Sequence, residues 1–383
     1  MSLFRLYPTI LALIRPKLNL SQPENQILHL IEHILLSPER QKEIGLDEKK
    51  FARDIFSCDG YISELYCVEY YVVRSQKSNL IKKLILSNSN NLCLDKINPQ
   101  TMKKVLIQEL EEEKTQEVSI SEQFEKAIYQ QKSPALKQPW FNKKELVNLN
   151  KNKVNLNEIF KKFNQPLLLL ELFFDKYKIS KKIMINKNIL IENAKIIHLG
   201  HPYQATRTSA IDILIPIILS PNNFINFVIY RVLLADYYFG ILYKIMRNNG
   251  LVYDLSINYN MYANAIQISF SCSKDKTNDA LNFSKKFMKK NQIVSESYLS
   301  LIKNKIATNY ELDWGNISDN PLYYIEEALL GEFYISPQER IEKIKKITAE
   351  DINNFHKTIC EGSEKNSIIT TLNYGKKVTK KTL

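Results

Sequence analysis

The sequence predicts an α+β protein built from two similar domains, and three observations lead to this expectation. The chain has 383 residues, which is enough for two domains that each bury a hydrophobic core. Hydrophobic residues make up 44% and charged residues 25%, as in ordinary globular proteins, so disordered, collagen-like and coiled-coil classes are excluded. Strand-like and helix-like segments alternate in the first half and again in the second half.

The first half begins with a strand expected at 10–20 and a helix at about 22–36. Ser21-Gln22-Pro23-Glu24 has the spacing of a capping box, with proline in the first turn, where its missing N–H costs nothing. Ser37-Pro38 is expected to end this helix. The other elements expected in this half are a helix at 48–57, a β-rich run at 62–73, and helices at 78–86 and 98–115.

The stretch 135–190 is rich in Lys and Asn around an apolar run at 167–174, and we place the domain boundary in its later part. The two domains predicted in this way are 1–182 and 183–383. The second half repeats the alternation without a short internal repeat, which suggests a duplicated domain. Its expected strands are 210–219, 251–259, 263–272 and 367–373, and its expected helices are 224–247, 278–290, 295–309, 321–333, 338–347 and 349–360.

Charge and apolar segments bear on partners and location. The net charge is +12, and such a surface can attract nucleic acid, anionic lipid or acidic peptides. Its basic residues are mostly Lys without tight clusters, so we expect no nucleic-acid partner and only a mild preference for acidic substrates. Five scattered cysteines suit a reducing cytosol. The start of the chain lacks a signal-peptide cleavage site, and the apolar stretch 224–243 carries Arg231 and Asp236, so we predict a cytoplasmic protein without membrane insertion.

The helix expected at 22–36 contains the segment His29-Leu30-Ile31-Glu32-His33. Positions i, i+3 and i+4 share one helix face, so both imidazoles and the carboxylate project from the same side. The remaining positions are apolar nearly all round, so the helix is predicted to be buried, and buried His and Glu need partners. Zinc satisfies two imidazoles, and a glutamate beside it can act as a general base toward water. The alternative is a helix whose polar side chains are satisfied without a metal.

A third ligand is expected on a separate element. The helix expected from residue 98 has an apolar stripe of Met102, Val105 and Leu106. These three residues and Glu109 fall within about 100° of one another on the helical wheel, so Glu109 lies on an apolar face where a carboxylate is costly unless it is paired or bound to a metal. Glu111 points the opposite way, as a solvated acid does. The alternative for Glu109 is an acid at the edge of the stripe that reaches water.

His29-x-x-Glu32-His33, with Glu109 lying 76 residues after His33, resembles the inverted zinc motif (inverzincin) of the M16 metallopeptidases. This family includes pitrilysin, insulin-degrading enzyme and the mitochondrial processing peptidase. Its third ligand lies on a helix of the form Val-x-x-x-Glu, which the segment from Val105 to Glu109 matches. The resemblance implies a zinc endopeptidase in which His29, His33 and Glu109 bind Zn²⁺ and Glu32 is the catalytic base toward zinc-bound water.

The resemblance extends over nearly the whole chain. It implies two similar α/β-sandwich domains, each a mostly antiparallel sheet with helices packed on one face. Residues 59–64 match the turn into a sheet-edge strand, where Ser63 and Glu64 stand in place of the usual substrate-binding Asn-Ala. Residues 246–253 match the segment of the second domain that contacts substrate, which implies this role for Arg247 and Tyr253. An endopeptidase must hold the peptide backbone, so we expect substrate to add as a β-strand along an edge at 62–73.

Three departures from the family pattern concern the surroundings of the third ligand and the segment that contacts substrate. A second glutamate seven residues before the third ligand is Met102 here, and the family arginine falls at Met246, one position before Arg247. Residues 235–240 replace a loop of small residues. We predict from this mismatch that the chain works with a second M16-like subunit, as a hetero- or homodimer. The alternative is that Arg247 reaches the site of its own chain through the one-residue shift.

Three functions from different classes are compatible with the sequence. The first is a zinc endopeptidase acting on peptides or unfolded segments, with peptide maturation as one such role. The second is a catalytically weak or inactive M16-like scaffold that supports a partner, against which the intact His29, Glu32, His33 and Glu109 weigh. The third, a nucleic-acid binder, depends on net charge alone. The zinc endopeptidase is the function that the sequence predicts.

Overall fold

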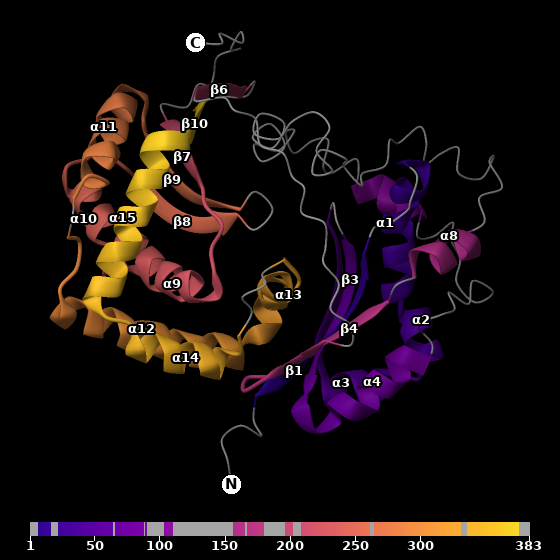
Figure 1. The fold of residues 1–383 in the computed structure, drawn as a ribbon. Coiled ribbons are helices and arrows are strands. Elements are labelled where there is room, and N and C mark those ends of the chain that lie inside the picture. The colour runs from indigo at the N-terminus through magenta and orange to yellow at the C-terminus, as the bar shows by residue number, and fades with distance from the viewer. Residues whose placement is uncertain are drawn as a thin grey trace.

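The chain folds around two five-stranded sheets, one from each half (Figure 1). The computed structural model describes residues 7–16, 22–63, 66–87, 89, 103–109, 156–164, 167–179, 196–201, 208–260, 264–290, 292–330 and 335–374. The first sheet has the order β2-β3-β1-β4-β5, formed by β1 (Pro8–Pro16), β2 (Ile55–Ile62), β3 (Tyr66–Arg74), β4 (Leu168–Leu172) and β5 (Tyr177–Ile179). The second has the order β6-β10-β7-β9-β8, formed by β6 (Ile196–His201), β7 (Thr208–Pro216), β8 (Asp254–Asn260), β9 (Ala265–Ser273) and β10 (Ile368–Tyr374).

The helices lie against these sheets. Those of the first half are α1 (Gln22–Leu36), α2 (Pro38–Glu43), α3 (Glu48–Asp54), α4 (Ser78–Ser87), α8 (Leu156–Phe163) and the helical residues 103–109. Those of the second half are α9 (Pro221–Ala235), α10 (Ile241–Asn248), α11 (Thr277–Phe287), α12 (Glu296–Gly315), α13 (Pro321–Leu330), α14 (Pro337–Lys346) and α15 (Ala349–Asn366). Short 3₁₀ turns occur at η2 (Ser75–Lys77), η4 (Lys274–Lys276) and η5 (Ile317–Asp319).

Strand pairing is almost entirely antiparallel, and the expected α+β fold class is confirmed. Every neighbouring pair in the first sheet is antiparallel. In the second sheet, β6 and β10 run parallel, and the other pairs are antiparallel. The orders β2-β3-β1-β4 and β8-β9-β7-β10 are equivalent, so both halves repeat one unit. The predicted boundary after residue 182 falls between β5 and β6, outside the described residues, and it stays a prediction.

Helix α1 has the bounds that its sequence predicts, and it is buried. Leu28, Ile31 and Ile34 are fully buried, in a cluster shared with Leu106 and with Phe160 of α8. Each such side chain stabilises the fold by about 1.5–3 kcal/mol through the apolar surface that it removes from water. As the sequence predicts, α1 ends before Ser37-Pro38: Ser37 has an extended backbone (φ −60°, ψ 144°) and becomes the N-cap of α2, where its Oγ accepts from the Arg40 N–H.

The single helix expected at 224–247 is wrong, because the chain turns between α9 and α10. Asp236 ends α9, and its Oδ1 accepts hydrogen bonds from the backbone N–H groups of Tyr238 and Phe239. Gly240 makes this turn possible, since a Cβ there would lie 2.4 Å from the Asp236 carbonyl oxygen. Within the described residues, no helix combines the length and hydropathy needed to cross a membrane.

The strand edge expected at 62–73 is also wrong. This run contains the end of β2 and most of β3, and β3 lies inside the sheet between β1 and β2. Eight of the nine residues of β3 are buried, so its sequence lacks the polar-apolar alternation of a strand with one exposed face. The edge strands of this sheet are β2 and β5, and β2 is the edge beside β3. The helix expected at 48–57 ends at Asp54, where β2 begins.

The two halves share one hydrophobic core. The face of the first sheet that points away from α1 belongs to the same buried cluster as the helices of the second half. Trp314 of α12 donates from Nε1 to the Pro8 carbonyl at 3.2 Å, and Tyr66 of β3 donates to Glu326 of α13 at 3.1 Å. Figure 1 shows α13 lying between the two sheets. The opposite face of the first sheet therefore carries α1 and the predicted site.

Candidate metal centre

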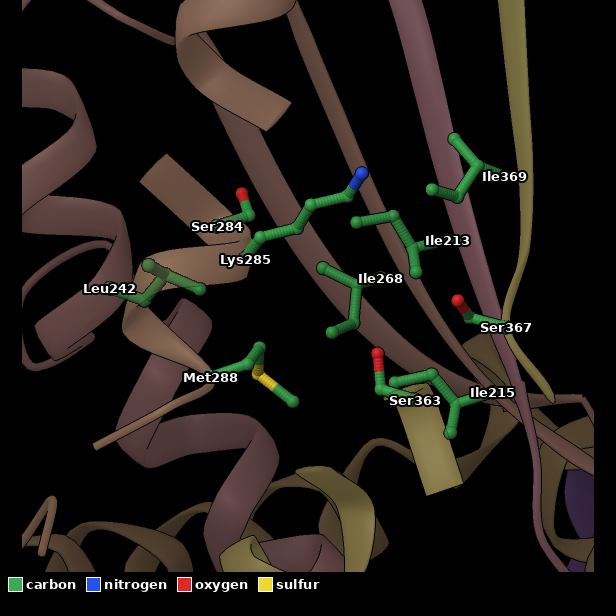
Figure 2. Close-up of a pocket in the computed structure, with 10 residues that line it drawn as sticks. All are labelled: Ile213, Ile215, Leu242, Ile268, Ser284, Lys285, Met288, Ser363, Ser367 and Ile369. Atoms are coloured by element: carbon green, nitrogen blue, oxygen red, sulfur yellow. The ribbon is translucent and has the colours of Figure 1, made fainter. Parts of the chain in front are cut away.

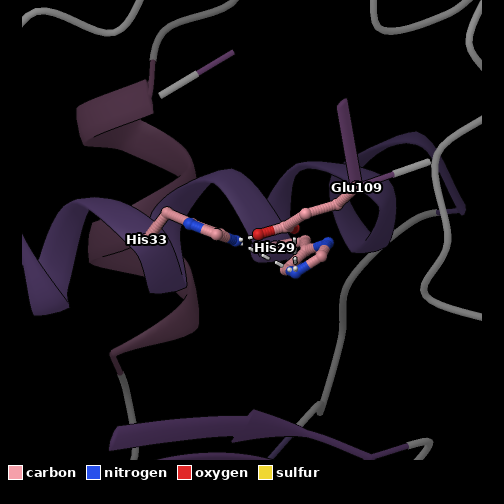
Figure 3. A group of neighbouring side chains, drawn as sticks. All are labelled: His29, His33 and Glu109. Carbon is pink, nitrogen blue, oxygen red and sulfur yellow. Dashed lines mark hydrogen bonds and ion pairs between the residues drawn. The ribbon is translucent and has the colours of Figure 1, made fainter. Parts of the chain in front are cut away.

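Three side chains from two helices converge on the outer face of the first half. His29 and His33 project from α1, and Glu109 projects toward them from the helical residues 103–109 (Figure 3). The His33 Nε2 lies 3.2 Å from the His29 Nε2 and 3.2 Å from the Glu109 Oε2, and the His29 Nε2 lies 3.7 Å from that oxygen. Among the described residues, these three form the one group with the geometry to hold a metal ion.

The donor set fits zinc. Ligand bonds of about 2.0–2.2 Å in a tetrahedron place neighbouring donor atoms about 3.3–3.6 Å apart, close to the measured separations of 3.2 to 3.7 Å. Two imidazoles and one carboxylate are a donor set typical of catalytic zinc, in which a fourth position stays open. Burial, with a smaller contribution from His33, lowers the pKa of His29 to about 4, so this imidazole is neutral at pH 7 and can donate its lone pair to a metal.

Glu32 lies beside the three candidate ligands. Its Oε2 is 3.8 Å from the Nε2 atom of each histidine, farther than these nitrogen atoms are from each other. Burial raises the pKa of Glu32 to about 8, and the carboxylates of Asp59, Glu109 and Glu69 add to this shift. A dication held by the three ligands would act in the opposite direction by favouring the charged carboxylate. A carboxyl group balanced between these influences can accept and release a proton near neutral pH.

A buried polar network ties α1 to the sheet beneath it. The Arg15 Nη2 lies 3.2 Å from the Glu69 Oε2, and the Tyr71 hydroxyl donates to the other oxygen of Glu69 at 2.6 Å. The Gln41 amide donates to the Tyr71 hydroxyl at 2.9 Å and to the Leu35 carbonyl, in the last turn of α1, at 3.0 Å. We did not expect this network from the sequence. The signal for it is the presence of Arg15 and Glu69 within otherwise apolar strands.

The predicted substrate residues of the second half lie near the start of β8. Arg247, in the last turn of α10, donates from Nη1 to the carbonyl oxygen atoms of Val252 at 3.1 Å and Tyr253 at 3.3 Å. Tyr253 itself is 51% exposed. Met246, at the position of the family arginine, is fully buried and contributes to the core. Substrate contact by Arg247 and Tyr253 stays a prediction.

Ser63, another predicted substrate residue, directly follows β2. Ser63 is buried, and its hydroxyl interacts with the backbone N–H and C=O of Tyr66 at 3.1 and 3.2 Å. These bonds close the connection between β2 and β3. Glu64 lies outside the described residues. The substrate-binding roles of Ser63 and Glu64 stay predictions.

The second half contains a pocket between its sheet and α10, α11 and α15 (Figure 2). Its lining residues are mostly apolar: Ile213, Ile215, Leu242, Ile268, Ser284, Lys285, Met288, Ser363, Ser367 and Ile369. None of them is a histidine or a carboxylate, so this lining lacks the ligands typical of a zinc site. The candidate metal centre is therefore the group on α1 and residues 103–109.

Comparisons with known proteins give a result for structure and none for sequence. No protein-family model and no curated protein matches the sequence. A protease from Helicobacter pylori aligns over 97% of this chain and 95% of its own, with a TM-score of 0.64 and 11% identity. An inactive M16 peptidase domain from Pseudomonas fluorescens aligns over 97% and 94%, with a TM-score of 0.62 and 11% identity. The ferredoxin protease FusC, solved with Arabidopsis ferredoxin, aligns over 97% of this chain and 43% of its own, with a TM-score of 0.61 and 10% identity.

The chain therefore has the fold of M16 peptidase domains. The expected resemblance to this family is confirmed for the fold, which is what similarity at 10% or 11% identity can show. Because the structural neighbours include proteases and a domain described as inactive, the fold alone does not determine activity. Activity has to be argued from the residues of the candidate metal centre.

Proposed function

We propose that this protein is a zinc-dependent endopeptidase that cleaves peptides or unfolded segments. The observation that carries the proposal is the convergence of His29, His33 and Glu109, with Glu32 beside them. The two histidines and Glu109 would hold the ion. Bound zinc supplies a Lewis acid that polarises the scissile carbonyl and increases the acidity of water.

The role proposed for Glu32 follows from its position. Its carboxylate lies within 3.8 Å of both imidazoles, so it can reach a water molecule placed next to the ligands. Glu32 takes a proton from the attacking water and later donates it to the nitrogen of the leaving amine. The polar network from Arg15 to Gln41 keeps α1, and with it Glu32, in a constant position relative to the sheet.

The edge strand β2 is the proposed binding element for the substrate backbone. It lies next to β3 at one end of the sheet, so its outer N–H and C=O groups can pair with an extended peptide. Such pairing depends on the backbone and accepts varied sequences, as an endopeptidase requires. The ferredoxin complex of FusC, which shares the fold, supports a polypeptide as the substrate class.

We also propose that a second M16-like subunit completes the active assembly. Arg247 is engaged with backbone carbonyls of its own segment, and Met246 is buried. This chain aligns with 43% of FusC and 43% of the Escherichia coli protease PqqL, so more than half of each of these neighbours lies outside the alignment, which leaves room for a second unit. The competing function, an inactive scaffold, has the support of the P. fluorescens domain described as inactive.

Zinc content and peptidase activity test the proposal together. The purified protein should contain about one zinc per chain, measured by elemental analysis, and lose it to a chelator. Cleavage of an unfolded protein should require zinc and should increase when the partner subunit, sought among the genomic neighbours, is added. A protein that binds no zinc and cleaves nothing under either condition would be a scaffold.

A further inference from the structure

The backbone of β2 lies directly against the side chain of Glu32, at Gly60. A Cβ built on Gly60 would lie 2.4 Å from the Glu32 Oε1, 2.8 Å from the Glu32 Cγ and 2.8 Å from the Leu36 Cδ1. Real Cβ atoms essentially never approach a neighbour closer than 3.0 Å. The observed position of the Glu32 carboxylate is therefore compatible with glycine at residue 60 and with no larger residue.

Glycine is required at residue 60 because there is no space for a side chain, and not because of its backbone conformation. Among the described glycines, Gly45 has a φ of +85° and Gly250 a φ of +63°, values that favour glycine through conformation. Gly60 lies in extended β2, opposite Glu69 of β3, and its φ is not in the positive region. A strand glycine of this kind marks a close approach of another group to the backbone.

The group that approaches Gly60 is the proposed general base. The side chain of Glu32 is 12% exposed and lies between α1 and β2, with its Oε2 directed at the two histidines. Strand β2 is also the edge strand to which an extended peptide would add in the proposed function. The contact between Gly60 and Glu32 thus determines how far the Glu32 carboxylate lies from the candidate ligands and from the substrate-binding edge.

We propose that Gly60 is a positioning residue, whose missing side chain lets the Glu32 carboxylate lie between α1 and the edge strand. This inference rests on the proposed function. A side chain at residue 60 displaces Glu32 from β2 and leaves His29, His33 and Glu109 on their own elements. The expected consequence is a protein that still binds metal and holds its base in the wrong place.

A stability measurement on metal-free protein tests the contact without reference to activity. In the presence of a chelator, Gly60→Ala should lower Tm by about 2–4 °C, because it overfills the space beside Glu32. In a Glu32→Ala background, the same Gly60→Ala change should lower Tm by less than half as much, since the conflicting carboxylate is gone. Gly362→Ala in α15 is the control without a steric conflict: its Cβ would meet only Ile215 Cγ2, at an ordinary 3.4 Å, and alanine favours the helix, so Tm should stay the same or rise. Equal Tm shifts in both backgrounds would overturn the proposed contact.

A kinetic measurement on zinc-loaded protein tests the positioning role. Gly60→Ala should keep its zinc and its KM while kcat falls on the order of a hundredfold, as expected for a misplaced catalytic group. Glu32→Asp, which removes one methylene, should cost less in the Gly60→Ala protein than in the wild type. Additive losses, or an unchanged kcat, would overturn the positioning role. If the wild type shows no zinc-dependent cleavage, the proposed function fails, while the Tm measurements still decide whether Gly60 and Glu32 are in contact.

Discussion

The two halves place the same two elements at their centres and use them differently. Each sheet has a nine-residue central strand, β1 or β7, followed by a fifteen-residue helix, α1 or α9. Counted from the first residue of each helix, the positions of His29, Glu32 and His33 on α1 correspond to Val228, Arg231 and Val232 on α9. One architecture therefore carries a candidate metal centre in one half and packing residues in the other, which shows that a site is an addition to this fold and not a property of it.

The solvent exposure of the equivalent positions on α1 and α9 also differs. In the second half, Val228 is 2% exposed, and α9 packs in the large core with α12 and α15. In the first half, the side chains of His29 and His33 are 18% and 21% exposed, and that of Glu109 is 40% exposed. The two halves thus differ most at one position, since His29 is partly exposed and the equivalent Val228 is buried, whereas Arg231 and Val232 are partly exposed on α9.

The largest expected effect contrasts two equivalent positions. His33→Ala should abolish both zinc binding and cleavage, because it removes one of three ligands. Val232→Ala, at the corresponding position of α9, should leave zinc content and kcat/KM within about twofold of the wild type. Elemental analysis and a peptide-cleavage assay measure both. Retention of a full equivalent of zinc by His33→Ala would refute the ligand assignment.

The next effect separates the base from the ligands. Glu32→Gln keeps the size of the side chain and removes its ability to take a proton. We expect zinc content to stay near one per chain while kcat falls by about 10²–10⁴-fold. Glu48→Gln, at an acid in the first turn of α3, is the control and should have no effect on either quantity. Cleavage at the normal rate by Glu32→Gln would exclude the proposed mechanism.

The third effect contrasts buried charge used for structure with buried charge used for chemistry. In the second half, Arg340 of α14 and Glu327 of α13 form an ion pair, and each side chain is 1% exposed. Glu327→Gln leaves the arginine buried without its counter-charge, so we expect unfolding to become about 3–5 kcal/mol easier in a denaturant titration. Zinc binding by the folded protein should be unchanged. A loss of stability below about 1 kcal/mol would show that Arg340 is satisfied by other groups.

A fourth, smaller effect concerns a buried histidine of the second half. Burial lowers the pKa of His356 to about 4, and its Nδ1 lies 2.8 Å from the Tyr230 hydroxyl. The unfolded chain, with a histidine pKa of about 6.5, binds more protons between these two values, so stability falls as the pH falls from about 6.5 to about 4. His356→Gln should remove about 1–2 kcal/mol of the stability difference between pH 7 and pH 5.

His29 contributes to the same pH dependence, because its pKa is also lowered to about 4. Denaturant titrations of the wild type and His356→Gln should therefore be compared at one zinc concentration, which keeps the contribution of His29 constant. An identical loss of stability on acidification in both proteins would show that His356 is protonated in the folded state at pH 5.

The smallest effect concerns the segment that departs from the family pattern. If a partner supplies this segment to the site, Arg247→Ala and Tyr253→Phe should each change the activity of the isolated chain by no more than about twofold. Adding the partner should then raise kcat/KM far more than either substitution lowers it. Full activity of the isolated chain, abolished by either substitution, would show instead that the chain completes its own site.

Local patterns in the sequence predicted the parts of the molecule that depend on neighbours along the chain. The bounds of α1 follow from the capping-box spacing with proline at its start and from Ser37-Pro38 after its end, and the spacing of His29, Glu32 and His33 places them on one face. Of the apolar stripe predicted on the later helix, Leu106 is buried and Val105 is 40% exposed, so Glu109 lies at the edge of the buried side, beside α1. The structure brings these residues together, and zinc binding by them stays a prediction.

In two other segments, the local sequence pattern did not lead to the correct prediction. The apolar run at 224–247 favours one long helix, whereas Asp236 and Gly240 contain the chemistry of a turn, and the turn is what forms. Strand β6, which we did not expect, has a mixed sequence that pairs in parallel with β10, more than 160 residues away. Its partner could not be found from its own pattern.

Tertiary structure alone decided which strand forms the edge and what surrounds the base. The position of β2 at the edge and of β3 inside the sheet results from pairing with β1, and strand propensity does not specify pairing partners. The ion pair of Arg15 with Glu69 and the contact of Gly60 with Glu32 join segments 54 and 28 residues apart. The periodicity of a segment depends on which of its own side chains face solvent. Contacts between distant segments depend on how the sheet and its helices pack, so they cannot be predicted from the pattern of either segment alone.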